Sequence, residues 1–418
     1  MTNDNQHIPT GYKPSPLGII PEDWEVKRIG EIGDFSKGNG VPKDKITKDE
    51  HGHSCLTYGD LYTKYDFVIM DIKSFIYDDV ASESKEIHIG DICFAGSGET
   101  PEDIGKCAAY IEESIAYAGG DIIILSPNKG INSIWLSYVL NSDIGGKQRY
   151  KFAQGFSIVH IYPDYLKQIQ IPTPTFTEQN NIVSILSLWD TAIAKQTALI
   201  EQLTLRKRGL MQQLLTGKKR LKGFEGEWKE VRLGEIGKFA GGCVFNEHEQ
   251  GGVEGVPFYK VSDMNLEGNE IQMTVANNYV TQEQISRLGY TVIDKDAIIF
   301  AKVGAAIALE RKRFAKNFII DNNMLAFVPN GNPWFMKYWF DSIILSKYIQ
   351  VGALPSYNAS DLAIIRLRLP SPSEQDAISK VLLNSDKEIE IQKQKLAALQ
   401  EQKKGLMQVL LTGKRRVK

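Results

Sequence analysis

Two short segments contain residue types found in methyl-transfer sites. Phe94–Gly98 reads Phe-Ala-Gly-Ser-Gly, an FxGxG pattern of the kind found in loops that bind S-adenosylmethionine. Asn332–Phe335 reads Asn-Pro-Trp-Phe and is similar to the Asn-Pro-Pro-Tyr/Phe box that holds a flipped adenine, except that Trp334 replaces the second proline. The two lie in different halves of the chain, and the equivalent of the first, Phe300–Gly304, lacks its glycine pattern. We therefore interpret Phe94–Gly98 as a structural turn.

Other polar groupings give weaker indications of chemistry. Glu83 and Lys85 follow Asp78 and Asp79 in a nuclease-like order that arises often by chance, and the pair in His51–His53 has no further metal ligands nearby in the sequence. We interpret the histidine segment as a loop. The chain has no GxxxxGK[ST] sequence, so ATP hydrolysis is not predicted. These residues predict neither a catalytic centre nor a metal site.

Composition indicates a globular protein of two or more domains. The 418 residues are 42% hydrophobic and 24% charged, with a net charge of −2. The four cysteines, Cys55, Cys93, Cys107 and Cys243, lack CxxC spacing, which predicts reduced core thiols rather than zinc ligands. No stretch approaches a membrane span, and the start at Met1 lacks a signal pattern. We expect a cytoplasmic protein without a membrane partner.

The elements that organise the chain are two copies of one sequence. Residues 207–220 and 403–416 are identical at 11 of 14 positions, at an offset of 403 − 207 = 196. Upstream, both copies continue as a spacing of four and three residues that is typical of a coiled-coil seam. The predicted seam consists of Ile182, Leu186, Trp189, Ile193, Gln196, Ile200, Leu203, Leu210, Leu214, Ile378, Leu382, Ile389, Gln392, Leu396, Leu399, Leu406 and Leu410.

Polar seam positions predict the direction in which the helices pair. A parallel pair would place Lys207 against Lys403, two like charges in one layer. An antiparallel pair places Lys403 beside Trp189 and Lys207 beside Ser385, and brings the glutamines at 196 and 392 into adjacent central layers, where they could set the register. We therefore predict an antiparallel coiled coil.

Each helix is expected to be about 39 residues, or roughly 58 Å, long. Thr177 and Ser373 are candidate N-caps, and Gly217 and Gly413 are candidate C-caps. The glycines at 209 and 405 lie inside the helices at a cost near 1 kcal/mol each, which either close approach of another backbone or a local kink would explain.

The globular parts are duplicated too. Trp24 precedes a Gly-Glu-Ile-Gly segment at 30–33, and Trp228 precedes the same segment at 234–237, at an offset of 234 − 30 = 204. Short β-rich runs dominate both interiors, with helical patterns at Ser133–Ser142 and Trp334–Tyr348. The predicted fold is α+β, with two pseudo-twofold-related repeats. We expect an extended arm (1–20), β-rich domain 1 (21–174), a helix (175–217), a basic linker (218–224), β-rich domain 2 (225–370), and a helix with a basic tail (371–418).

The motifs that carry a family resemblance are Pro-Glu-Asp-Trp-Glu-Val at 21–26, the Gly-Asp-Ile turn at 90–92 and the Leu-Leu-Thr-Gly helix ends. Through them, the chain resembles the specificity subunit of type I restriction–modification systems. The resemblance covers nearly the whole chain. It implies two target recognition domains, each reading one half of a split, asymmetric site in double-stranded DNA, and helices that fix the gap and dock two methyltransferase subunits. A restriction subunit can join. The resemblance also implies that this chain is not an enzyme and binds no cofactor, because its partners use S-adenosylmethionine, ATP and Mg.

Symmetry supports the same reading without the resemblance. Two repeats packed through an antiparallel helix pair are related by a pseudo-twofold axis, which matches the local twofold axes of duplex DNA. Because the domains differ in sequence, their half-sites should differ. Two other interpretations remain open: a fused methyltransferase–specificity enzyme, and a coiled-coil protein adaptor that does not bind DNA.

The DNA-contact candidates are polar and basic residues expected in loops, although each one alone could be an ordinary solvated side chain. They are Ser97, Thr100, Lys106, Lys151, Gln154, Ser157 and His160 in domain 1, and Lys302, Arg311, Lys312, Arg313, Ser356, Tyr357 and Asn358 in domain 2. The basic segments 218–220 and 414–416 could contact phosphates or an acidic partner surface, or could simply be solvated helix ends.

Overall fold

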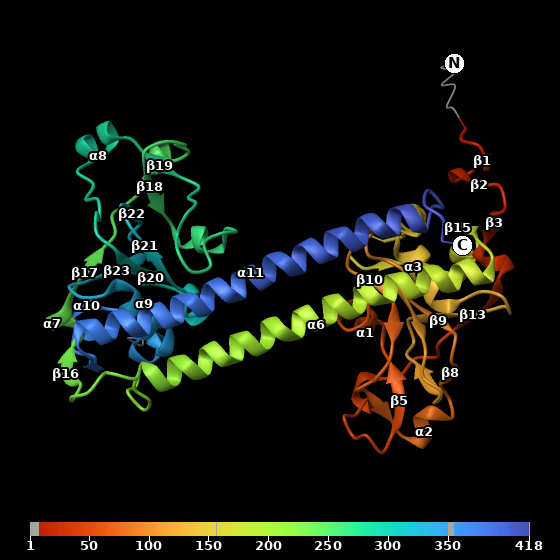
Figure 1. Cartoon of the computed structure of the whole chain (residues 1–418), viewed down its shortest axis with the longest axis horizontal. Coiled ribbons are helices and arrows are strands. Elements are labelled where there is room, and N and C mark those ends of the chain that lie inside the picture. The colour runs from red at the N-terminus through yellow and green to blue at the C-terminus, as the bar shows by residue number, and fades with distance from the viewer. Residues whose placement is uncertain (1–7, 156, 350–354, 418) are drawn as a thin grey trace. The chain divides into compact units, whose positions relative to one another are not determined.

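The fold is described from a computed structural model, which covers residues 8–155, 157–349 and 355–417. It divides into two compact units, each described by itself. Unit 1 contains Met1–Gln196 and Lys395–Lys418, and unit 2 contains Thr197–Gln394. The structure has two long helices, α6 (Phe176–Leu214) and α11 (Pro372–Leu410) (Figure 1). One part of each helix belongs to unit 1 and the other part belongs to unit 2.

Domain 1, the β-rich part of unit 1, contains two main sheets. A five-stranded sheet has the order β4-β13-β9-β11-β6, in which only the β11–β6 pair is parallel. Its strands are β4 (Gly33–Lys37), β13 (Ile122–Pro127), β9 (Ile92–Ala95), β11 (Cys107–Tyr110) and β6 (Val68–Ile69). A four-stranded sheet has the order β7-β5-β12-β8, with strands β7 (Phe75–Ile76), β5 (His53–Leu56), β12 (Ala116–Ala118) and β8 (Lys85–Ile87).

Small pairs and short helices complete domain 1. β3 (Glu25–Arg28) pairs with β15 (Gln170–Thr173), and β10 (Ser97–Gly98) pairs with β14 (Val159–His160). The helices are α1 (Tyr58–Thr63), α2 (Asp78–Ala81), α3 (Ser133–Asn141), α4 (Asp143–Lys151) and α5 (Pro163–Leu166), with 3-10 turns η1 (Ile29–Glu31) and η2 (Lys43–Lys45). Helix α3 confirms the predicted helix at Ser133–Ser142. Asn132 caps it by accepting a hydrogen bond from the Trp135 amide.

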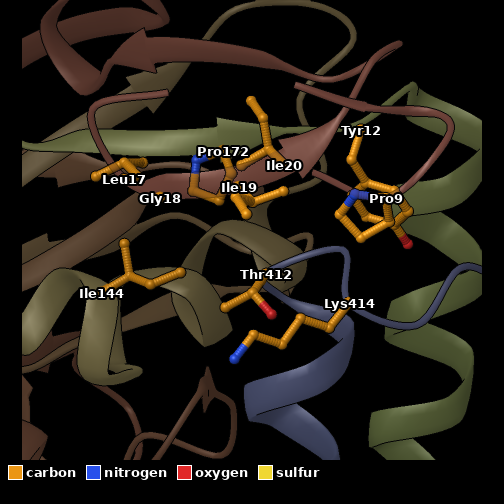
Figure 2. Close-up of a pocket in the computed structure, with 10 residues that line it drawn as sticks. All are labelled: Pro9, Tyr12, Leu17, Gly18, Ile19, Ile20, Ile144, Pro172, Thr412 and Lys414. Carbon is orange, nitrogen blue, oxygen red and sulfur yellow. The ribbon is translucent and has the colours of Figure 1, made fainter. Parts of the chain in front are cut away.

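The expected extended arm is instead a hairpin, formed by β1 (Tyr12–Ser15) and β2 (Gly18–Pro21). The Tyr12 hydroxyl donates a 3.0 Å hydrogen bond to the Gly413 carbonyl oxygen, so the hairpin packs on the end of α11. The hairpin, α4 and the segment that follows α11 line an open, largely apolar pocket of about 650 Å³ (Figure 2). The arm prediction was wrong because Gly18 supplies the positive φ, +99°, that a tight hairpin turn needs. The first seven residues lie outside the described part of the chain.

Domain 2, the β-rich part of unit 2, repeats the central frame. Its antiparallel sheet has the order β17-β23-β20-β21, matching β4-β13-β9-β11, with strands β17 (Gly237–Gly241), β23 (Met324–Pro329), β20 (Ala297–Ala301) and β21 (Lys312–Ala315). A second sheet has the order β19-β18-β22, with strands β19 (Tyr279–Val280), β18 (Val256–Tyr259) and β22 (Ile319–Ile320), and β16 (Lys229–Arg232) pairs with β24 (Arg366–Leu369).

The helices of domain 2 are short. They are α7 (Leu233–Ile236), α8 (Gln282–Leu288), α9 (Pro333–Ser342) and α10 (Ala359–Ala363), with 3-10 turns η3 (Glu247–Glu249), η4 (Val261–Asn265), η5 (Ala305–Leu309) and η6 (Leu345–Tyr348). The helical pattern predicted at Trp334–Tyr348 is divided between two elements, because α9 ends at Ser342 and η6 follows it. Ile343 at the C-cap is extended, with φ −109° and ψ 153°, which breaks the helix.

The ends of the long helices correct one prediction and support another. Thr175 and Ser371 are the residues before α6 and α11, and their hydroxyl oxygens accept hydrogen bonds from backbone amides in the first turns. The predicted caps, Thr177 and Ser373, lie two residues too far along, inside the first turns of the helices. In α11 this follows from Pro372, whose fixed φ suits the first helical position. The glycines at 217 and 413 both have φ +70°, as helix-ending glycines require.

Candidate nucleic-acid interface

In unit 1, a partly buried polar cluster connects domain 1 to both long helices. Tyr138 of α3 donates a hydrogen bond to Asp190 of α6, and Lys403 of α11 forms an ion pair with the same carboxylate. The Lys403 ammonium lies 4.0 Å from the ring centroid of Phe67 and 5.1 Å from that of Tyr138. Burial lowers the pKa of Lys403, although Asp190 opposes this shift, and burial together with Asp190 raises the pKa of Tyr138.

Unit 2 contains the equivalent cluster. Tyr338 of α9 donates a 2.6 Å hydrogen bond to Asp386 of α11, and Lys207 of α6 forms a 2.5 Å ion pair with that carboxylate. The Lys207 ammonium lies 5.2 Å from the ring centroid of Tyr338. Burial, followed by the contact with Asp386, raises the pKa of Tyr338. In each unit, therefore, the aspartate lies on the domain's own helix and the lysine comes from the helix of the other repeat.

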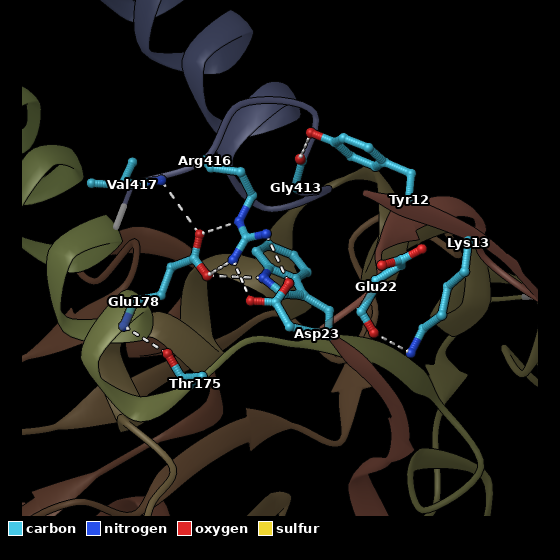
Figure 3. Close-up of polar contacts among 10 residues, drawn as sticks. Tyr12, Lys13, Glu22, Asp23, Thr175, Glu178, Gly413, Arg416 and Val417 are labelled. Carbon is cyan, nitrogen blue, oxygen red and sulfur yellow. Dashed lines mark hydrogen bonds and ion pairs between the residues drawn. The ribbon is translucent and has the colours of Figure 1, made fainter. Parts of the chain in front are cut away.

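A second polar cluster lies at the start of each long helix. In unit 1, the Trp24 indole nitrogen donates a 2.9 Å hydrogen bond to Glu178 of α6, which also binds Arg416 from the tail beyond α11 (Figure 3). In unit 2, Trp228 donates a 3.2 Å hydrogen bond to Glu374 of α11, which also binds Arg220 from the linker beyond α6. We call these the Trp–Glu–Arg clusters.

These pairs establish the helix direction within each unit. In unit 1, Asp190 pairs with Lys403 while Glu178, earlier in α6, pairs with a residue beyond the end of α11. In unit 2, Lys207 pairs with Asp386 and Arg206 pairs with Glu388. Because partner numbers rise on one helix as they fall on the other, the antiparallel prediction is confirmed. The lysines pair with Asp190 and Asp386, which directly follow the predicted seam neighbours Trp189 and Ser385.

The predicted seam residues contribute to the domain cores at the helix ends. Ile182, Leu186 and Leu410 are buried in the core cluster of domain 1, and Leu406 packs against it. Leu214, Ile378 and Leu382 are buried in that of domain 2, and Leu210 packs against it. Leu203 and Gln196 are also buried, while the partly exposed members are Trp189, Ile193, Ile200, Ile389, Gln392, Leu396 and Leu399. The suggested contact between the two glutamines stays a prediction, since they belong to different units.

The helix glycines face open space. An added Cβ atom at Gly209 or at Gly405 would have no heavy atom within 4 Å, apart from its own helix neighbourhood. Of the two alternatives for these glycines, close approach of another backbone is therefore not found within the described part of the chain. Both residues lie within uninterrupted helices, α6 and α11.

In domain 1, three DNA-contact candidates lie together. His160 of β14 pairs with Ser97 of β10, and the Ser97 hydroxyl and the Nδ1 atom of His160 are 2.9 Å apart. Gln154 forms an isolated bridge with His160 and is exposed. Ser97 itself is only 4% exposed and its hydroxyl already bonds His160, so it is less suited to contact a base directly.

The other domain 1 candidates have separate positions. Thr100 donates a hydrogen bond to Asp103, and Lys106 pairs with Asp66 at 3.3 Å. The remaining two candidates, Lys151 and Ser157, are exposed.

In domain 2, two candidates are in the interior. Lys312 is 3% exposed, pairs with Glu310 at 2.5 Å, and donates a 3.0 Å hydrogen bond to the Ile343 carbonyl oxygen. Tyr357 is 3% exposed and its ring contacts Phe300 edge-on. We correct both predictions, because β21 turns Lys312 into the domain and Tyr357 fills its core. The sequence signal was misleading, since Lys312 stands in a run of three basic residues.

The neighbouring arginines are better placed. Arg311 donates a hydrogen bond to Asn265, and Arg313 donates one of 3.2 Å to the Lys312 carbonyl oxygen. In the described residues, neither Nε atom has a hydrogen-bond partner, and burial lowers the pKa of Arg313. The remaining candidates are half-buried or exposed: Lys302, Ser356 and Asn358.

Segments that resembled catalytic motifs have structural roles. Phe94–Gly98 spans the end of β9 and the short strand β10, and Asn332 caps α9 by accepting a 2.7 Å hydrogen bond from the Phe335 amide. Asp78 pairs with His53 at 2.7 Å. Across the described residues, no group of three or more His, Cys, Asp or Glu side chains is arranged to hold a metal ion. Nor does any helix among them have the length and apolar character needed to cross a membrane.

Comparison with known proteins identifies the family. The profile of the type I restriction modification DNA specificity domain matches residues 21–205 and 225–401. In Methanocaldococcus jannaschii, the chain is 29% identical to a protein provisionally assigned as the type I restriction enzyme MjaX specificity subunit, over 97% of each chain. It is 26% identical to the MjaVIII specificity subunit, over 96% of this chain and 94% of that one.

Two solved structures share the fold. The type I restriction–modification S subunit from M. genitalium gives a TM-score of 0.55 at 17% identity, covering 93% of this chain and 96% of that one. A chain from a study of complex assembly and conformational transition of a type I system gives 0.61 at 17% identity, covering 95% and 99%. The protein belongs to the type I restriction–modification specificity family: it is the DNA specificity subunit, and catalysis lies in the partner subunits.

Proposed function

We propose that domains 1 and 2 each read one half of a bipartite, asymmetric site in double-stranded DNA, and that α6 and α11 set the gap between the halves. The observation that carries this proposal is the exact repetition of the supporting clusters against divergent domains. Asp190 and Asp386 differ by 386 − 190 = 196, as do Lys207 and Lys403. The clusters that hold the domains are the same in both repeats, whereas the surfaces of the domains differ, so the two domains are suited to read two different half-sites.

The direct DNA contacts are proposed at exposed or half-buried polar residues. Ser97, Lys312 and Tyr357 are left out of this set because they are buried. Phosphate contacts would come from the lysines and arginines, whereas amides and hydroxyls are suited to base edges. The set comprises Thr100, Lys106, Lys151, Gln154, Ser157, His160, Lys302, Arg311, Arg313, Ser356 and Asn358.

We further propose that the long helices dock two methyltransferase subunits and that restriction subunits join the complex. The partners would use S-adenosylmethionine, ATP and Mg. Support comes from the family to which the chain belongs.

A domain exchange tests the division of labour. Residues of roughly 20–172 would be replaced by the matching domain of another family member, and methylated adenines would then be mapped in DNA treated with the reconstituted complex. One half of the methylated sequence should change while the other half stays the same. Altered reading of both halves would refute the proposal.

A further inference from the structure

We propose that Arg416, in the tail beyond α11, is a positioning residue for domain 1 and is needed for accurate reading of one half-site only. The inference rests on the proposed function, in which each domain reads one half-site. It assigns a role in specificity to the segment that follows α11, far in sequence from domain 1.

The contacts of Arg416 tie three segments of unit 1 together (Figure 3). Its guanidinium donates two hydrogen bonds to Glu178, of 2.8 and 2.9 Å, and two to Asp23, of 2.8 and 2.7 Å. It also lies 5.8 Å from the Trp24 ring centroid. A planar guanidinium that engages two carboxylates through paired bonds fixes both distance and orientation. Arg416 therefore connects Asp23, near the start of domain 1, to the first turn of α6, the long helix that follows this domain.

Because this cluster is largely buried, it is expected to stabilise the fold more than an ion pair on the surface would. The Glu178 side chain is 4% exposed and that of Arg416 is 20% exposed, whereas exposed pairs contribute little. Glu178 also accepts a hydrogen bond from the fully buried Trp24, so losing Arg416 would leave a buried carboxylate with an unpaired charge.

The equivalent cluster in unit 2 shows what is different about Arg416. Arg220 binds Glu374 through two hydrogen bonds, of 2.5 and 2.7 Å, and lies 5.7 Å from the Trp228 ring centroid. However, Arg220 precedes Trp228 by only 228 − 220 = 8 residues of continuous chain. The linker therefore keeps the tail of α6 close to domain 2 even when the side-chain bonds open.

No such short link exists in unit 1. Arg416 follows Trp24 by 416 − 24 = 392 residues, so only non-covalent contacts hold the tail against the domain entrance. Asp23 supplies the additional carboxylate there, whereas the second anchor of Arg220 is a single hydrogen bond to the Gly226 carbonyl oxygen. The extra ion pair is consistent with a junction that has no covalent support.

The test compares Arg416→Ala with Arg415→Ala and Arg220→Ala in the complete reconstituted complex. Arg415 is the matched control, since it removes the same charge from the same tail but its side chain is exposed. Methylated adenines are mapped in a library in which both half-sites vary. Arg416→Ala should lose about tenfold or more in discrimination at the half-site of domain 1, equivalent to ~1.4 kcal/mol, and retain the other. Arg415→Ala should match the wild type, and Arg220→Ala should have the smaller effect, confined to the other half.

A second measurement follows the junction itself. Hydrogen exchange in the full chain should rise in Arg416→Ala around the hairpin at 12–21 and at the Trp24 indole, while the Trp228 indole remains protected. Unchanged exchange together with unchanged reading would overturn the proposal, as would equal loss at both half-sites. If the wild-type complex itself shows no bipartite site, the proposed function fails instead, and the exchange result still decides whether Arg416 holds the junction.

Discussion

The hydroxyl group of Tyr338 donates a 2.6 Å hydrogen bond to the carboxylate of Asp386, and this bond fastens domain 2 to its own long helix. The Asp386 side chain is only 12% exposed. The arrangement recurs in unit 1 between Tyr138 and Asp190, although the two domains differ in most of their loops. The contacts that mount each domain are thus better preserved between the repeats than the surfaces proposed to read DNA.

Replacing Tyr338 by phenylalanine should destabilise unit 2. The substitution removes a hydrogen bond to a charged, mostly buried acceptor, so the free energy of unfolding should fall by about 1.5–3 kcal/mol. Urea denaturation of the full chain measures it. Tyr150→Phe is the control, because Tyr150 is 51% exposed and should tolerate the change. Equal effects of the two substitutions would contradict the role assigned to the Tyr338 hydroxyl.

The Trp–Glu–Arg cluster of unit 1 predicts a pH dependence of stability. Burial alone would raise the pKa of Glu178, but hydrogen bonds from Arg416, Trp24 and the Val417 amide outweigh it and hold the pKa below 4.5. A carboxyl group with a lowered pKa stabilises the fold above its unfolded pKa, and this contribution is lost as pH falls through the folded pKa.

The matched variant for that test is Glu178→Gln. The difference in unfolding free energy between wild type and Glu178→Gln should be largest near neutral pH and should shrink below about pH 4.5. Denaturation curves over this range measure the difference. A constant difference across the range would show that the charge of Glu178 contributes nothing.

The open space at Gly209 predicts that alanine stabilises the isolated chain. Glycine in a helix interior costs about 0.5–1 kcal/mol relative to alanine, and the added methyl group meets no atom within 4 Å. Gly209→Ala and Gly405→Ala should each raise the midpoint of thermal unfolding. A lower midpoint would mean that the space is filled in solution. If the variants are stabilised but assemble poorly with the methyltransferase, the partner is the component that approaches the glycines.

If α6 and α11 set the gap between the half-sites, the length of the gap should change with the length of the helices. Asp190 and Lys207 are 207 − 190 = 17 residues apart on α6, and Asp386 and Lys403 are 403 − 386 = 17 apart on α11. Inserting seven residues between these positions in both helices preserves the heptad and adds about 10 Å, or about three base pairs, to the gap. Mapping methylated sites measures the gap. An unchanged gap would refute the proposal that the long helices set the gap.

The near-neutral charge predicts weak DNA binding by the chain alone. Because phosphate neutralisation dominates affinity, a net charge of −2 leaves little general attraction for DNA. The isolated chain should bind its target poorly at moderate salt, while the complex with methyltransferase subunits should bind tightly. Titration of labelled target DNA with each gives the comparison, and equal affinities would contradict the expectation.

The sequence by itself determined the duplication, the long helices and their direction. A repeat at an offset of 196 and a sustained heptad spacing are local patterns, so they can be read without knowing distant contacts. The like charges of Lys207 and Lys403 were enough to choose the antiparallel pairing, and the family resemblance rested on equally local motifs. Asp190 and Asp386 directly follow seam positions 189 and 385, and this is the sequence signal for the lysine clusters.

Only the tertiary structure decided which polar residues face inward. In the sequence, Lys312 and Tyr357 look like loop residues that could contact DNA. In the structure both are buried, and Lys312 forms an ion pair with Glu310, because strands and helices far apart in the chain pack around them. In the sequence, Arg416 belongs to a basic segment that could contact phosphates or an acidic partner, or be solvated. Its actual partners, Glu178 and Asp23, are more than two hundred residues away (416 − 178 = 238). Side-chain charge is a property of the residue, whereas desolvation and pairing are properties of the folded neighbourhood.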